Sequence, residues 1–194
     1  MGINVFANIP ITVDLNIVRE TIKLRNNSRI NRDTEELIRQ ANGIAKPKAL
    51  FIESTMQETD GHSVLIDGIA FRNKTLIETL KDQDKVYPYV VTCGIEIDGF
   101  SETLNDPMKK FILDGIMMIL VNSAKDFLAC HIKEKYKYND LKIYVPGATE
   151  EWQKDEQEQL FALVGDETEL IGVSLSDTGF VLPRRSNIGI MIRA

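Results

Sequence analysis

Cysteine and histidine are scarce in this chain of 194 residues, which contains two of each. Cys93, Cys130, His62 and His131 have neither zinc-finger nor Cys-x-x-Cys spacing, so the sequence argues against a structural metal site. The low cysteine content and the absence of a signal-peptide pattern are typical of a protein of the reducing cytoplasm. We therefore expect a cytoplasmic location.

Positive charge and long apolar runs are also limited. The 23 Lys and Arg residues against 29 Asp and Glu give a net charge of −6, which argues against a general nucleic-acid binder, because such binding needs cations that neutralise phosphates. The most apolar run, Ile116 to Val121, is too short to cross a bilayer. A hydrophobic content of 43% is ordinary for a soluble globular protein, and we expect one domain over residues 1–194.

Helix and strand patterns alternate along the chain without a regular βαβ rhythm. The longest helix pattern starts at Asp106-Pro107, an aspartate cap followed by a proline at the first helical position, and runs to about Tyr136. Gly115 inside it costs about 1 kcal/mol of helix propensity, which indicates a packing reason. We predict an α+β fold with a mostly antiparallel sheet, flanking helices and one long central helix. Further expected elements are a loop over Arg25 to Asn31, a helix from Asp33 or Thr34, a strand over Val86 to Ile97, a helix over Trp152 to Val164, and strands over Leu170 to Leu175 and Ile188 to Ile192.

Two turns near the C-terminus are the candidate functional features. Pro146-Gly147 follows one predicted strand, and Pro183-Arg184-Arg185-Ser186 precedes the last one. Backbone donors and positive charge at two strand ends could converge on one small anionic or zwitterionic ligand. The alternative is an ordinary strand-to-helix turn and a pair of solvated arginines. Nothing resembles a hydrolase or transferase motif, since no Gly-x-Ser-x-Gly, P-loop, Rossmann fingerprint or His-Glu-x-x-His is present.

Three further residues have a polar or reactive group inside an apolar pattern. Asp114 and Asn122 lie eight residues apart in the long helix and point to roughly similar sides. Polar groups on a buried helix need partners, which a ligand or an internal hydrogen bond can provide. Cys93 lies in an apolar strand pattern, which indicates an inert buried thiol.

Several short patterns, in their order and spacing, resemble one known family from about Val18 to the end of the chain. The family is the activation (reactivation) domain of vitamin B12-dependent methionine synthase, in particular its short free-standing bacterial members. The patterns are Val91-Thr92-Cys93-Gly94, Ile112-Leu113-Asp114-Gly115-Ile116, Pro146-Gly147, Trp152, Glu156-Gln157, Leu160-Phe161, Ile171-Gly172-Val173, Leu175, Pro183, Arg185-Ser186 and Gly189.

This resemblance implies a twisted antiparallel sheet and a place in methionine biosynthesis. In the family, the domain binds S-adenosylmethionine and docks over the cobalamin of methionine synthase. With an electron from a flavodoxin-type donor, it supports reductive remethylation of that cobalamin. Catalysis of this kind rests chiefly on positioning.

The family's ligand-binding side chains are replaced in this sequence. When the family motif Arg-x-x-x-Gly-Tyr is laid on Pro146-Gly147, Ile143 takes the arginine position and Ala148 the tyrosine position. The family's long helix carries a glutamate that contacts the ligand amino group. This glutamate aligns with Asn122, whose side chain has no charge to balance that group.

Two hypotheses follow. In the first, the chain is an activation-domain-like protein of a corrinoid methyltransferase system, with candidate ligand-facing residues Asn122, Pro146, Gly147, Ala148, Arg184, Arg185 and Ser186. In the second, it is a non-catalytic module that binds a corrinoid protein and has lost S-adenosylmethionine binding.

Overall fold

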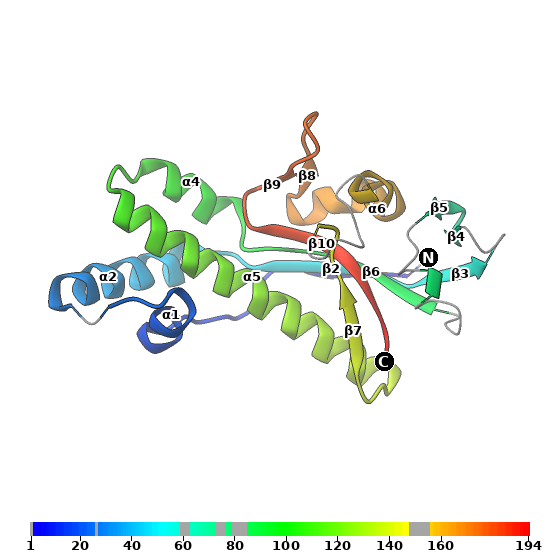
Figure 1. Cartoon of the computed structure of the whole chain (residues 1–194), viewed down its shortest axis with the longest axis horizontal. Helices are drawn as coiled ribbons and strands as arrows, with labels where there is room; N and C mark the ends of the chain where they lie inside the picture. The colour runs from blue at the N-terminus through cyan, green and yellow to red at the C-terminus, as the bar shows by residue number, and fades with distance from the viewer. Residues whose placement is uncertain (1, 26, 59–62, 73–76, 79–84, 148–155) are drawn as a thin grey trace.

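A computed structural model describes residues 2–25, 27–58, 63–72, 77–78, 85–147 and 156–194. It combines one large sheet with helices on both faces and at one end (Figure 1). The described elements are β1 (Ile3–Phe6), α1 (Leu15–Ile22), α2 (Ser28–Ile44), β2 (Lys48–Ile52), β3 (Ser54–Glu58), β4 (Val64–Ile66), β5 (Ile69–Phe71), β6 (Lys85–Thr92), α4 (Ile95–Thr103), α5 (Pro107–Tyr136), β7 (Leu141–Tyr144), α6 (Gln157–Val164), the 3-10 helix η2 (Gly165–Ile171), β8 (Ser174–Leu175), β9 (Val181–Leu182) and β10 (Ser186–Arg193).

Strand β6 lies at the centre of the sheet. It pairs with β2 on one side and β10 on the other, so that Thr92 lies opposite both Lys48 and Ser186. Strand β1 extends the sheet beyond β2, and β7 extends it beyond β10. The β3–β4–β5 meander joins the start of β6. Every strand pair among the described residues is antiparallel, so the predicted sheet type is confirmed.

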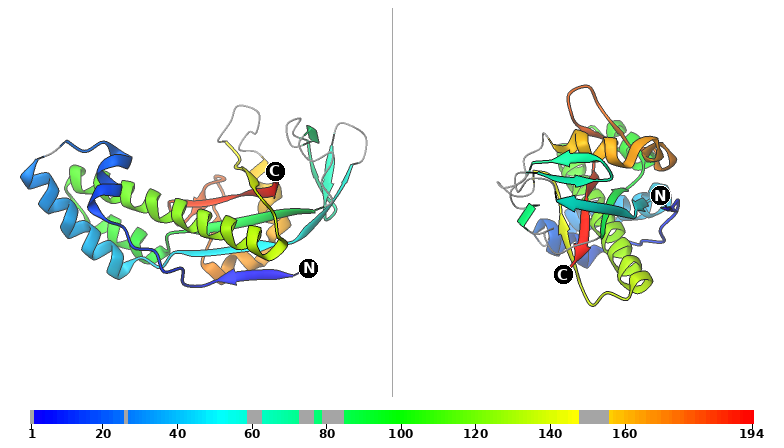
Figure 2. Two further views of the ribbon diagram at one scale, coloured as in Figure 1. Left: turned by 90° about the horizontal axis from the view of Figure 1, so that it is seen from below. Right: turned by 90° about the vertical axis from the view of Figure 1, so that its right-hand side faces the viewer.

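The sheet is covered on both faces. Because side chains alternate along a strand, Tyr87, Tyr89 and Val91 of β6 pack towards α5, whereas Val86 and Val90 pack towards α6. The right-hand view of Figure 2 shows α5 on one side of the strands and α6 with η2 on the other. The fold therefore has a three-layer body in which the central strand is almost entirely buried.

The first half of α5 leaves the sheet and forms a helical end with α1, α2 and α4 (Figure 1). Helix α5 begins as predicted, because the Asp106 side chain accepts hydrogen bonds from the backbone N–H groups of Met108 and Lys109. Its length confirms the predicted central helix. Gly115 also has the expected packing reason, since a Cβ at that position would lie 2.5 Å from Cγ2 of Ile22. None of the helices within the described part of the chain is both long and apolar enough to cross a membrane.

Two predicted boundaries are wrong because local contacts override the sequence pattern. The strand predicted over Val86 to Ile97 ends at Thr92, and α4 begins at Ile95. Gly94 lies between them at a φ of +97° and donates its backbone N–H to Thr92 Oγ1 at 3.1 Å, which turns the chain out of the sheet. Helix α2 begins at Ser28 rather than at residue 33 or 34, because the Asn27 side chain caps it.

The C-terminal elements also differ in part from the prediction. Residues 165–171 form a 3-10 helix, so the strand predicted from Leu170 is reduced to Ser174–Leu175. The last strand and the end of α6 at Gly165 agree with the prediction. The predicted start of that helix at Trp152 lies outside the described residues.

Candidate ligand-binding site

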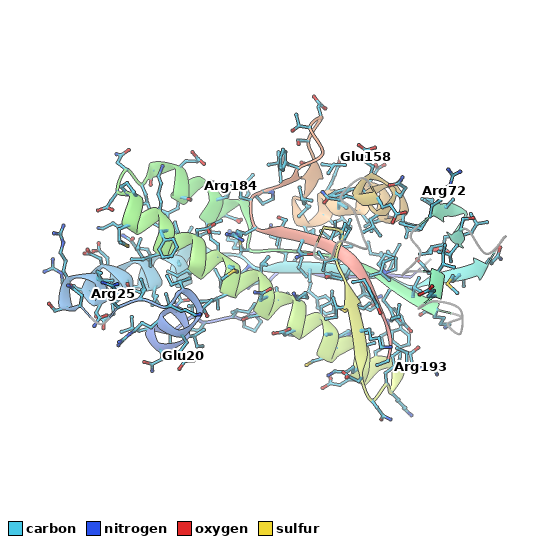
Figure 3. The ribbon with its side chains drawn as sticks, in the orientation of Figure 1. Glu20, Arg25, Arg72, Glu158, Arg184 and Arg193 are labelled. Atoms are coloured by element: carbon cyan, nitrogen blue, oxygen red, sulfur yellow. The ribbon has the colours of Figure 1, made fainter. Side chains whose placement is uncertain are left out.

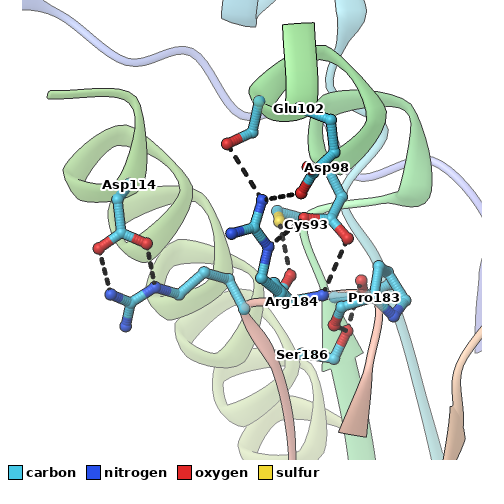
Figure 4. Close-up of polar contacts among 10 residues, drawn as sticks. Cys93, Asp98, Glu102, Asp114, Pro183, Arg184 and Ser186 are labelled. Atoms are coloured by element: carbon cyan, nitrogen blue, oxygen red, sulfur yellow. Dashed lines mark hydrogen bonds and ion pairs between the residues drawn. The ribbon is translucent and has the colours of Figure 1, made fainter. Parts of the chain in front are cut away.

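The turn from Pro183 to Ser186 lies where β10, α4 and α5 meet. The Leu182–Pro183 peptide is cis, and Arg185 has a φ of +59°. The Ser186 hydroxyl lies 2.7 Å from the carbonyl oxygen of Pro183 and 2.9 Å from the hydroxyl of Thr92, which ties the turn to the end of β6. From this fixed turn the Arg184 side chain points towards Asp98 and Glu102 of α4 (Figure 4), whereas Arg185 binds Asp114 of α5.

Arg184 binds α4. Its Nε donates to Asp98 Oδ1 at 3.0 Å, and its Nη2 donates to Ser101 Oγ at 3.2 Å and to Glu102 Oε1 at 2.7 Å. Its backbone N–H donates to the second oxygen of Asp98 at 3.2 Å. The hydrogen bond with Asp98 raises the pKa of Arg184, so the guanidinium stays charged. Arg184 therefore holds the turn against α4, and its donors are largely committed within the chain.

Arg185 binds α5 through Asp114. Its Nε donates to Asp114 Oδ1 at 2.8 Å, and its Nη2 donates to Oδ2 of the same carboxylate. The hydrogen bond with Asp114 raises the pKa of Arg185. The pair remains accessible, because the side chains of Arg185 and Asp114 are 39% and 52% exposed. A ligand can therefore reach both charges.

This ion pair lies on a cavity of about 500 Å³, which we call the hairpin groove because the β8–β9 hairpin forms one wall. Figure 3 shows the surroundings, with Arg184 between α4 and β9 and Glu158 on α6. The volume is within the range of roughly 300–1,000 Å³ for small-molecule sites. The lining residues are Asp114, Gln157, Gly179, Phe180, Val181, Arg184, Arg185 and Ser186.

A second cavity of about 300 Å³ lies beside the first and shares Asp114 and Arg184 with it. Its other lining residues come from α4 and the start of α5: Ser101, Glu102, Lys110, Phe111 and Met117. The hairpin groove combines an accessible ion pair, an aromatic ring and a side-chain amide, so it offers charged, aromatic and hydrogen-bonding contacts to one small ligand.

Three of the predicted site residues, Arg184, Arg185 and Ser186, line the hairpin groove. Asn122 does not belong to the described lining of either cavity: it is exposed on α5 and accepts a hydrogen bond from Lys125 Nζ at 3.2 Å. Asp114 is the polar residue of the long helix that meets the site. The sequence had left a ligand and an internal partner as alternatives for it, and its partner within the chain is Arg185.

Pro146 and Gly147 are not among the described residues that line the two cavities. Strand β7 runs antiparallel to β10 with Tyr144 opposite Ile190, so the chain after Tyr144 runs towards the Ser186 end of β10. The two strands approach closely at Gly189, where a Cβ would lie 2.2 Å from the Tyr144 carbonyl oxygen. Pro146 is buried and Gly147 is exposed, whereas Ala148 lies outside the described residues.

Sequence reasoning missed the hairpin side of the groove. Gly179, Phe180 and Val181 come from the β8–β9 hairpin, and Gln157 from the first turn of α6. The run Ser176-Asp177-Thr178-Gly179 was the available signal, because such residues are frequent in turns. Strands of two residues are too short to give an alternating pattern on either side of it.

The thiol of Cys93 is buried, and the described residues include no cluster of metal-binding side chains. Burial raises the pKa of the Cys93 thiol to about 12, and its Sγ lies 3.7 Å from the Arg184 carbonyl oxygen. This environment confirms the prediction of a buried Cys93 and disfavours the reactive thiolate. No group of three or more His, Cys, Asp or Glu side chains in the described part of the chain is arranged to hold a metal ion.

The fold is similar to that of a solved protein domain. The crystal structure of the MetH reactivation domain bound to AdoHcy aligns with 100% of this chain and 78% of that chain, with a TM-score of 0.68 and 13% sequence identity. The likeness extends to the antiparallel sheet and the long central helix, and at this identity it shows the fold alone. No protein-family model matches the sequence, and no curated protein sequence matches it either.

Proposed function

We propose that this chain is an activation-domain-like component of a corrinoid (B12)-dependent methionine synthase or methyltransferase system in the cytoplasm. It would assist S-adenosylmethionine-dependent reductive remethylation of cobalamin held by a partner chain, with a flavodoxin-type protein as electron donor. The observation that carries the proposal is the whole-chain likeness to the MetH reactivation domain bound to AdoHcy. Because one fold can host many functions, the groove must also suit the ligand.

The charges of the hairpin groove suit the amino-acid end of S-adenosylmethionine. Asp114 can accept hydrogen bonds from an ammonium group, and the planar fork of Arg185 suits a carboxylate. A zwitterionic ligand brings both charges, so it can replace the partner of each residue without leaving either charge uncompensated. Bound S-adenosylmethionine supplies a methyl group on a sulfonium. The contribution of this chain would be to hold that ligand in position, with Arg184 fixing the turn.

A second candidate function is docking to a corrinoid protein without binding of S-adenosylmethionine. Arg185 already has a carboxylate partner within the chain, and the position of the family's helix glutamate is an exposed asparagine, Asn122. Ile143 likewise lacks the guanidinium found at that position in the family. These features favour a non-catalytic module that binds a corrinoid protein without S-adenosylmethionine.

Calorimetric titration separates the two candidates. AdoHcy should bind the purified chain with saturable heat below millimolar concentration. 5′-Methylthioadenosine, which lacks the amino-acid end, should bind at least tenfold more weakly, because it cannot replace the partners of Asp114 and Arg185. No heat from AdoHcy at millimolar concentration would reject the first candidate and leave the second.

The partner is tested separately. A cobalamin-loaded methionine synthase fragment without its own reactivation domain should form a complex with this chain in size-exclusion chromatography. A complex without AdoHcy binding would fit the docking module alone. Failure to bind this corrinoid fragment would count against both candidates.

A further inference from the structure

The tip of the β8–β9 hairpin is held in one shape by its own hydrogen bonds. Ser176 N–H donates to the Phe180 carbonyl oxygen at 2.8 Å, and Gly179 N–H donates to the Ser176 carbonyl oxygen at 2.9 Å. Phe180 N–H donates to the Ser176 hydroxyl at 3.0 Å. Gly179 has a φ of +75°, a conformation that glycine adopts readily. The backbone of Gly179 and Phe180 is therefore fixed at the edge of the hairpin groove.

Gln157 faces this tip from the first turn of α6. Its Nε2 donates to the Gly179 carbonyl oxygen at 3.2 Å. A carbonyl oxygen can only accept, so this contact fixes which end of the amide faces the hairpin. One N–H of Nε2 and the oxygen Oε1 are then left on a residue that lines the groove. An amide in this orientation offers a neighbouring donor and acceptor, the pair that a glutamine presents to the edge of adenine.

Phe180 provides an aromatic surface beside that amide. It lines the same groove, and 61% of its surface is exposed. Aromatic side chains bind nucleobases by stacking on their faces. The charged residues Asp114 and Arg185 come from α5 and the turn before β10, whereas Gln157 and Phe180 come from α6 and the hairpin. The groove thus has charged walls and a separate aromatic and amide wall.

We infer that Gln157 and Phe180 form an adenine-specific subsite of the hairpin groove. Phe180 stacks on the base, and the Gln157 amide accepts from the adenine amino group while donating to a neighbouring ring nitrogen. The inference rests on the proposed function for the adenosyl class of ligand, and it adds the residues that select the base. Hypoxanthine has an oxygen in place of the adenine amino group. This oxygen would face Oε1 of Gln157, so two acceptors would meet. The Gln157 amide cannot rotate to avoid this without losing its hydrogen bond to the Gly179 carbonyl oxygen.

The test compares AdoHcy with S-inosylhomocysteine, which differs only in the base, by calorimetric titration. Wild-type protein should bind AdoHcy about tenfold more tightly, as expected for one mismatched hydrogen-bonding edge. Gln157→Leu should bind the two ligands within about twofold of each other. Phe180→Leu should lower the affinity for both ligands about tenfold. It should keep the preference for AdoHcy, because stacking does not distinguish the bases. The matched control is Gln40→Leu, at an exposed position on α2 and not among the lining residues, which should behave like wild type.

The possible results separate this inference from the proposal beneath it. Suppose that wild-type protein binds AdoHcy while Gln157→Leu keeps the wild-type preference for AdoHcy over S-inosylhomocysteine. In that case Gln157 only anchors the hairpin: the inference is overturned, but AdoHcy remains the ligand. If wild-type protein binds both ligands equally, the adenine-specific subsite is again rejected. If wild-type protein does not bind AdoHcy, both the ligand and the subsite are rejected.

Discussion

Arg185 and Asp114, 71 residues apart in the sequence, form a bidentate ion pair between the turn before β10 and helix α5. The pair closes one side of the hairpin groove and leaves both side chains partly exposed. Each charge thus has one partner in the chain and remains within reach of a ligand. A ligand with a single negative charge would take Arg185 away from Asp114 and leave that carboxylate without a positive partner. A zwitterion can satisfy both residues. Under the proposed function, this pair favours a ligand that has both charges.

Replacing Asp114 by asparagine tests this selection. Asp114→Asn keeps a hydrogen-bond acceptor for Arg185 but removes its counter-charge. We expect the free energy of unfolding to fall by only about 0.5–1 kcal/mol, because the pair is solvent-exposed. The affinity for AdoHcy should fall at least tenfold, because the ligand ammonium loses its carboxylate. Urea unfolding and calorimetric titration measure the two effects.

The control is Asp126→Asn, at an exposed position on the same helix. It has the same change of net charge but lies outside the residues that line the groove. It should leave the AdoHcy affinity unchanged. Equal affinities for Asp114→Asn and wild-type protein would show that another group binds the ammonium.

Gly189→Ala tests the close approach of β7 to β10. An added Cβ would lie 2.2 Å from the Tyr144 carbonyl oxygen and 3.0 Å from the Tyr89 ring, so backbone must move. We expect a loss of about 2–3 kcal/mol in the free energy of unfolding, as for overpacking at a rigid site. Amide hydrogen exchange should also become faster in β7, which leads into Pro146-Gly147. Gly99→Ala is the control, because a Cβ there meets nothing within 4 Å. Unchanged exchange in β7 would mean that the strand tolerates the shift.

The sequence predicts the elements whose signals are local. Helix α5 has an aspartate cap, a proline at its first position and apolar residues throughout, and its bounds agree with the structure. Helix α4 could not be predicted in this way. Its first residues, Ile95-Glu96-Ile97, continue a strand-like pattern, and their helical state depends on the turn at Gly94 and on burial of Ile97 in the helical core.

The site is predictable only in part for a related reason. The two arginines are conspicuous in the sequence, but their partners are set by tertiary contacts. Asp114 and Asn122 lie on similar sides of α5, yet eight residues separate them by about 12 Å along the axis. Only the packing of the turn before β10 against α5 brings one of them to Arg185. The hairpin wall was missed because its strands have two residues each, so that only the turn between them left a signal in the sequence.

Gly115→Ala tests the packing of α1 on α5. Alanine is favoured over glycine by about 1 kcal/mol in a helix, but the added Cβ would lie 2.5 Å from Cγ2 of Ile22. We expect overpacking to dominate and to lower the free energy of unfolding by about 1–2 kcal/mol. Gly43→Ala in α2, where a Cβ has nothing within 4 Å, should instead be neutral or stabilising. The double variant Gly115→Ala, Ile22→Ala should lose less free energy of unfolding than the sum of the losses in the two single variants. Additive losses in this double-mutant cycle would contradict the proposed contact.

The buried thiol of Cys93 should make stability depend on alkaline pH. Burial raises its pKa from 9.0 to about 12, so above pH 9 the folded protein keeps a proton that the unfolded chain loses. The unfolded state then binds fewer protons, and stability falls as pH rises from about 9 towards 12. We expect wild-type protein to lose about 1–2 kcal/mol more than Cys93→Ala between pH 8 and 10, measured by urea unfolding, since each pKa unit corresponds to about 1.4 kcal/mol. Buried tyrosines titrate equally in both proteins and cancel in the difference. Parallel profiles for Cys93→Ala and wild type would contradict the raised pKa.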